Sequence, residues 1–68
     1  MEFVPDVSAK AIQLWNEGTF LATKMNGRRI SLYRHNRKYY VIYYTKENLL
    51  EKIAQVDKET ATKIFNNF

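Results

Sequence analysis

The sequence contains no cysteine, so a disulfide framework and a thiolate metal site are both excluded. Small secreted domains usually depend on disulfides, and no basic segment followed by an apolar stretch opens this chain, so we expect a cytoplasmic protein. An initial Met1 favours a native start of the chain. The longest nearly apolar run is Tyr39–Tyr44, which is too short to cross a bilayer, and no membrane partner is expected.

Glycine and proline are also scarce, with two glycines and one proline in 68 residues. This composition leaves no flexible linker, and the chain has no repeat or low-complexity stretch. A length of 68 residues suits one domain, and an apolar fraction of 46% is enough to build a core. We therefore predict a single small α+β domain over residues 1–68.

The two glycines separate segments of different periodicity, and the first segment predicts a helix from about Ser8 to Glu17. Asp6 or Ser8 can cap its first turn, because either side-chain oxygen can accept from a free backbone N–H. Gly18 would end the helix in a left-handed conformation. The apolar face of this helix consists of Val7, Ala11, Ile12, Leu14 and Trp15, and Trp15 is predicted to anchor the core.

The middle segment predicts a three-stranded antiparallel meander over about 19–25, 28–34 and 38–44. Asn26-Gly27 between the first two strands is typical of a two-residue hairpin with a type I′ turn. A less regular turn is expected at 35–37, before a strand rich in β-branched and aromatic residues. In that strand either the set Tyr40, Ile42 and Tyr44 or the set Tyr39, Val41 and Tyr43 could face the core, so at least two tyrosines face outward in both cases.

The last segment predicts helical structure in two parts, with a break near Val56, and one continuous helix is the open alternative. Thr45 can cap the first part and Asp57 the second. The side chains expected to face the core from the first part are Leu49, Leu50, Ile53 and Ala54. The predicted element order is therefore α-β-β-β-α-α.

The net charge of +4 is concentrated in the middle of the chain, because residues 19–45 carry six basic side chains and no acidic one. Strand side chains alternate between faces, so a sheet with one buried face would turn Ile30 and Leu32 inward and Arg29, Tyr33 and His35 outward. Basic side chains neutralise phosphates, and tyrosine rings stack on bases. The sequence thus predicts nucleic-acid binding by a basic, tyrosine-rich sheet face consisting of Arg29, Tyr33, Arg34, Arg37 and Lys38.

The sequence is compatible with two interpretations other than nucleic-acid binding. The basic side chains could simply keep the sheet edges soluble, with the tyrosines acting as cross-strand packing pairs. The chain could also be a protein-interaction or homodimerising accessory domain that uses an apolar C-terminal stripe, formed by Ile64, Phe65 and Phe68. In that case the positive charge would attract an acidic protein partner or confer solubility.

Nothing in the sequence assembles into an active site. His35 is the only histidine, and the serines have no identifiable base or orienting acid. The acidic residues near the C-terminus alternate with lysines, which is typical of a solvated helix surface, as in the Glu59–Lys63 pair. We therefore expect a non-enzymatic binding module with no cofactor, no metal and no small-molecule substrate.

Overall fold

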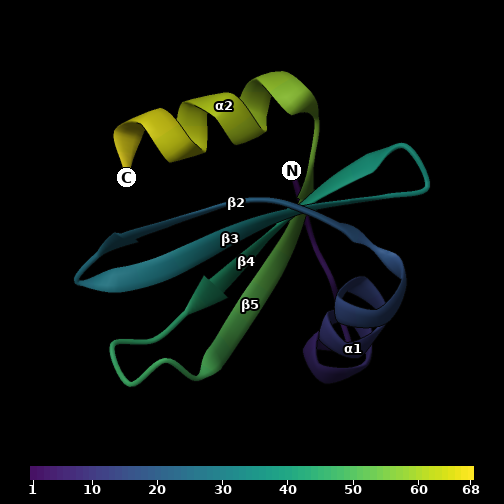
Figure 1. Cartoon of the computed structure of the whole chain (residues 1–68), viewed down its shortest axis with the longest axis horizontal. Helices are drawn as coiled ribbons and strands as arrows, with labels where there is room; N and C mark the ends of the chain where they lie inside the picture. Colours follow the sequence, from purple (N-terminus) through teal and green to yellow (C-terminus); the bar gives the residue numbers. More distant parts are fainter.

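The computed structural model describes residues 1–68 and contains a five-stranded antiparallel sheet with one helix on each side (Figure 1). The strand order is β1-β5-β4-β3-β2. The elements are β1 (Glu2–Phe3), α1 (Val7–Glu17), β2 (Thr19–Asn26), β3 (Arg28–His35), β4 (Lys38–Tyr44), β5 (Leu50–Val56) and α2 (Lys58–Asn67). The α+β class is confirmed, but the predicted three strands are part of a larger sheet.

Helix α1 begins where its first-turn amides find an acceptor. The Asp6 carboxylate accepts a hydrogen bond from the Ala9 backbone N–H at 3.1 Å, so Asp6 and not Ser8 caps the helix. Ala11 and Leu14 are completely buried against the sheet. Trp15 is 49% exposed, so its predicted role as the core anchor is wrong.

Gly18 ends α1 for a reason that differs from the predicted one. Its φ of −81° and ψ of 168° are extended, so the expected left-handed conformation is wrong. A Cβ atom at this position would lie 2.7 Å from the Leu14 carbonyl oxygen, which is the acceptor of the Gly18 N–H. Glycine is therefore required by the close approach of the chain to the last turn of α1.

The β2–β3 and β3–β4 hairpins are both present, but the type I′ conformation occurs in the second turn and not in the first. At the first hairpin only Gly27 has a positive φ, of 76°, whereas a type I′ turn requires positive φ at both central residues. At the second hairpin Asn36 and Arg37 both have positive φ, of 52° and 65°. The type I′ pattern thus falls on Asn36-Arg37, where the arginine carries a conformational cost that glycine would avoid.

Residues 50–56 form strand β5, so the predicted helix in this segment is wrong. Ile53 and Ala54 are adjacent and fully buried, and they belong to separate core clusters on opposite faces of the sheet. A short apolar run of this kind suits an interior strand with two covered faces as well as a helix. Thr45 does not cap a helix, and its hydroxyl instead accepts from the Leu49 N–H within the loop before β5.

Helix α2 begins at the predicted position. The Asp57 carboxylate accepts from the Thr60 N–H at 2.7 Å, and Ala61 is buried in the first turns. The predicted break near Val56 is the junction between strand β5 and helix α2.

The two faces of the sheet carry separate cores. On the α1 side, the buried cluster consists of Ala11, Leu14, Tyr40, Ile42, Tyr44 and Ile53. On the α2 side, it consists of Ile30, Val41, Ala54, Val56 and Ala61. Strand β4 supplies both clusters, because Tyr40, Ile42 and Tyr44 face α1 and Val41 faces α2. The expectation of a sheet with a single buried face is therefore wrong.

Candidate functional site

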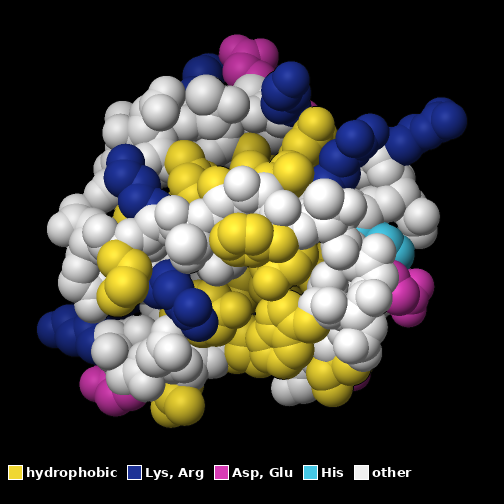
Figure 2. All heavy atoms as spheres, in the orientation of Figure 1, with side chains coloured by type: hydrophobic (Ala, Val, Ile, Leu, Met, Phe, Trp, Pro, Cys, Tyr) yellow, Lys and Arg dark blue, Asp and Glu magenta, His cyan; other side chains and the backbone are white.

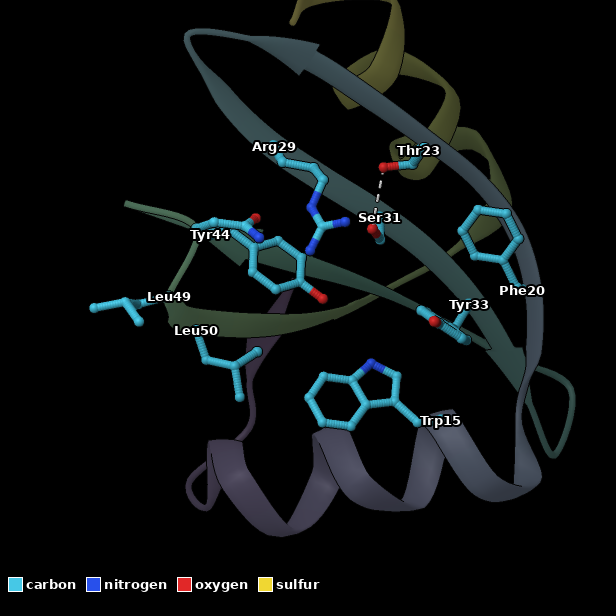
Figure 3. A pocket seen from close by; sticks show the side chains of 10 residues that line it. Trp15, Phe20, Thr23, Arg29, Ser31, Tyr33, Tyr44, Leu49 and Leu50 are labelled. Atoms are coloured by element: carbon cyan, nitrogen blue, oxygen red, sulfur yellow. Dashed lines mark hydrogen bonds between the residues drawn. The ribbon is translucent and has the colours of Figure 1, made fainter. Parts of the chain in front are cut away.

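An open pocket of about 570 Å³ lies on the α1 side of the sheet, between α1, the β2–β3 hairpin and the β4–β5 loop (Figure 3). In Figure 2, hydrophobic side chains gather in the same region between α1 and this loop, with a basic side chain at the border. The pocket is lined by Trp15, Phe20, Thr23, Arg29, Ser31, Tyr33, Tyr44, Asn48, Leu49 and Leu50.

Exposed rings form the mouth of the pocket. Trp15 reaches it from the last turns of α1, and Phe20, at the start of β2, is 54% exposed (Figure 3). The Phe20 and Tyr33 rings meet edge to face with their centroids 5.6 Å apart. Leu49, which is 63% exposed, lies across the pocket on the β4–β5 loop. Large apolar side chains left accessible around a hollow are typical of a binding site.

Arg29 is the single charged group of the pocket. It points from β3 toward the α1 side, and its guanidinium carbon lies 4.2 Å from the centroid of the Tyr44 ring. The Arg29 Nε is buried and has no hydrogen-bond partner, and no acidic side chain lines the pocket. A guanidinium over an aromatic ring, with no carboxylate beside it, retains its capacity to bind an anion.

Hydroxyl groups form the floor of the pocket. Thr23 and Ser31 lie on paired strands, and their hydroxyl oxygens are 3.2 Å apart. The Thr23 hydroxyl also donates to the Ile30 carbonyl oxygen at 2.9 Å. Burial raises the pKa of the Tyr33 phenol, the neighbouring Tyr44 raises it further, and Arg29 partly opposes the shift. Tyr33 is therefore a neutral phenol at physiological pH.

A second hollow of about 320 Å³ adjoins the pocket, because Arg29 and Asn48 line both. Its lining adds Arg28 and Lys46 and contains no acidic side chain. Arg28 is nevertheless paired with Glu51 at 3.6 Å, at an exposed site where such a pair contributes little. The two hollows together form a continuous surface that is apolar at the Trp15 end and basic at the Lys46 end.

The structure brings together only part of the site predicted from sequence. Arg29 and Tyr33 both line the pocket. Arg34 lies on the opposite face, with its guanidinium carbon 6.0 Å from the centroid of the Tyr39 ring, a partly buried side chain on the α2 side. Arg37 occupies the β3–β4 turn, and Lys38 is the first residue of β4. The five side chains therefore do not share one open face.

Sequence reasoning missed the aromatic mouth of the pocket. Trp15 follows Ala11 and Ile12 at helical spacing, which predicts a core position, yet both Ile12 and Trp15 are about half exposed. The signal for Phe20 is its place as an aromatic residue in the strand that starts directly after the helix-ending Gly18. Leu49 was obscured by the incorrect helix over the β4–β5 loop.

The C-terminal stripe has another position. Ile64, Phe65 and Phe68 are partly buried and pack against the core on the α2 side of the sheet. They close this small core, and an interface built on them stays a prediction.

Groups for other chemistry are sparse. The His35 Nε2 lies 3.7 Å from a carboxylate oxygen of Glu17. In the hollow that this pair lines, the Thr19 hydroxyl is the one side-chain nucleophile. No group of three or more histidine, aspartate or glutamate side chains lies close enough together to hold a metal ion. Neither helix has the length and apolar character needed to cross a membrane.

Comparison with known proteins gives no relative: no protein-family model matches the chain, and no curated protein or solved structure is similar to it. The geometry of the pocket is therefore the basis for a functional hypothesis.

Proposed function

We propose that this chain is a small non-enzymatic module that binds single-stranded nucleic acid by receiving an unstacked base in the pocket. One observation carries the proposal: an open pocket with exposed aromatic rings at its mouth contains an arginine and no acidic side chain. A cytoplasmic location belongs to the same proposal, since a nucleic-acid partner is abundant there.

The mouth of the pocket suits a planar ligand. Trp15 and Phe20 are about half exposed, and stacking of one base on an aromatic side chain contributes about 1–3 kcal/mol. Single strands are favoured over duplexes, because bases in a duplex are already stacked and paired. The floor adds the Tyr33 phenol, which can donate to a base or sugar oxygen.

Basic side chains on either side of the pocket would contact phosphates. Arg28 and Lys46 line the adjoining hollow, so a strand that leaves the pocket past Arg29 meets positive charge. Arg37 and Lys38 lie toward the other end of the β3–β4 hairpin. Since β3 has eight residues, its two ends are roughly 23 Å apart, a distance that a few nucleotides of an extended strand would cover.

The single tryptophan provides a direct test. We expect titration with a short single-stranded oligonucleotide to quench the fluorescence of Trp15, because a base stacks on its ring, and we expect affinity to fall steeply with salt. Arg29→Gln should weaken binding by about tenfold or more, which corresponds to loss of about 1.4 kcal/mol.

Lys63→Gln is the matched control, because Lys63 is an exposed basic residue of α2 that pairs with Glu59. It removes the same charge and should leave the affinity nearly unchanged. Absence of binding at low salt would refute the proposal. Equal losses in the two variants would show that net charge attracts the strand and that the pocket plays no part.

A further inference from the structure

Strand β2 leaves one long edge of the sheet unpaired. It is the last strand in the sheet order and bonds only to β3 (Figure 1). Seven of its eight residues are exposed, and only Ala22 is partly buried. The opposite edge is different, because β1 has only two residues. A row of free backbone N–H and C=O groups along an exposed strand is a template for another strand.

The usual protection of such an edge is largely missing from β2. The strand contains no proline and no acidic residue, and Lys24 is its only charged side chain. The Lys24 ammonium is directed to the Phe65 carbonyl oxygen of α2, at 2.6 Å, and so does not guard the edge. One irregularity at Leu21, which has no partner in β3, is the remaining device against strand addition.

The same strand exposes large apolar side chains at both of its ends. Phe20 and Leu21 are 54% and 44% exposed near its start, and Met25 is 70% exposed near its end. Thr23 and Ala22 lie between them. The side chains are therefore large and apolar near the two ends of the strand and small at its centre.

We propose that β2 pairs antiparallel with β2 of a second copy of this chain, about a twofold axis near Thr23, to form a continuous ten-stranded sheet (five strands from each copy). Antiparallel pairing about this axis brings the start of one strand opposite the end of the other. Leu21 then lies opposite Met25 of the partner subunit, and Lys24 lies opposite Ala22 of the partner subunit.

Charge favours a second copy over an acidic peptide as the occupant of this edge. The chain carries its surplus charge elsewhere, and the edge itself has one lysine whose ammonium is already engaged. The pairing about Thr23 places no like charges directly opposite each other, which would be destabilising. The free apolar side chains gain a partner only if an equally apolar strand lies beside them.

The pairing would also extend the candidate site. Phe20 and Thr23 of β2 line the pocket, and Met25 lines the adjoining hollow. A neighbouring β2 would therefore add the side chains of the partner subunit to one wall and place two pockets beside the shared edge. The dimer does not depend on nucleic-acid binding, so the two proposals can fail separately.

Sedimentation velocity of the full chain over a range of concentrations tests the pairing. We expect a discrete monomer–dimer equilibrium, and we expect hydrogen exchange of β2 amides to slow as the dimer forms. Leu21→Lys should weaken the dimer by at least about tenfold, because it buries a charge next to Met25 of the partner subunit. Ile12→Lys is the control, since Ile12 is 55% exposed on α1, away from β2.

Leu21→Lys should fold, because Leu21 is exposed and unpaired with β3, and circular dichroism verifies this. Met25→Lys is a second disrupting variant at the other end of the strand. A chain that stays monomeric at all concentrations would overturn the proposal. So would a dimer that survives both β2 variants, or one that is lost with Ile12→Lys alone, which would place the interface on α1.

Discussion

The two faces of the sheet are covered in different ways, although the same strands supply both. On the α2 side, Ile30, Val41 and Ala54 are buried under a helix whose Ile64 and Phe65 extend the cluster. On the α1 side, the helix seals Ile42 and Ile53 but leaves an open pocket beside β2. One face thus completes a core, and the other combines a core with an accessible site.

Strand β3 illustrates the origin of this difference. Ile30 points to the α2 side and is fully buried, whereas its neighbour Arg29 points to the α1 side with the pocket. Ser31 follows on the pocket side and forms a hydrogen bond with Thr23. Strand β3 thus presents an aliphatic side chain to α2 and polar side chains to the α1 side. Helix α1 alone does not close a face with this polar set.

The largest expected effect contrasts a closed position with an open one. Ile30→Ala removes a fully buried side chain and should lower the free energy of unfolding by about 2–5 kcal/mol, because a cavity remains in the α2-side core. Trp15→Ala should cost much less stability, since half of its side chain is already in water. Urea denaturation followed by circular dichroism measures both.

The contrast fails if Trp15→Ala destabilises the chain as much as Ile30→Ala does, because Trp15 would then be a core residue. Affinity for single-stranded oligonucleotides, measured by anisotropy, separates the two further. Trp15→Ala should lose affinity while it stays folded, and Ile30→Val, a milder variant of the closed face, should retain affinity.

A smaller effect is expected at the junction that sets the position of α1 relative to β2. Gly18→Ala would place a Cβ atom 2.7 Å from the Leu14 carbonyl oxygen, so the end of α1 must shift. We expect a loss of about 1–3 kcal/mol, as for other overpacked sites, and a change in Trp15 emission because the mouth of the pocket moves. Thermal unfolding and the emission spectrum measure the two effects.

Gly27→Ala is the comparison for this variant. No heavy atom beyond residues 26–28 would lie within 4 Å of its Cβ, but its φ of 76° costs a non-glycine residue about 1–2 kcal/mol. It should therefore lower stability and leave Trp15 emission unchanged. An unchanged emission spectrum in Gly18→Ala would show that the packing at Gly18 does not control the pocket.

Local signals predicted the elements that depend on neighbouring residues. The helix after Asp6, the two hairpins and the helix after Asp57 all follow from caps, turn residues and alternation that a few adjacent positions specify. Strand β5 could not be assigned in this way. Whether Ile53 and Ala54 belong to a strand depends on β1, β4 and both helices, which are distant in sequence.

The candidate site was harder to predict than the fold for the same reason. Arg29 and Tyr33 were identified from alternation within one strand, and the structure places both in the pocket. Their association with Trp15 and Leu49 depends on how α1 and the β4–β5 loop cross the sheet. Arg34 lies on the other face from Arg29, as the alternation of side chains along β3 already indicates, so these two arginines do not share a site.

The smallest expected effect concerns Asp57, the residue that caps α2, the helix covering the closed face of the sheet. The hydrogen bond from the Thr60 backbone N–H lowers the pKa of Asp57 below its ordinary value of 3.8. Because the folded-state pKa is the lower one, the stabilisation is fully present above the unfolded value and is lost as pH falls through the folded value. We expect hydrogen exchange of α2 amides to accelerate in this acidic range while α1 amides respond less. Asp57→Asn keeps a capping oxygen without a titrating group, so this response should be reduced in that variant. An equal response of α2 in Asp57→Asn and the wild type would mean that Asp57 does not control the cover, and that acid opens the closed face through other groups.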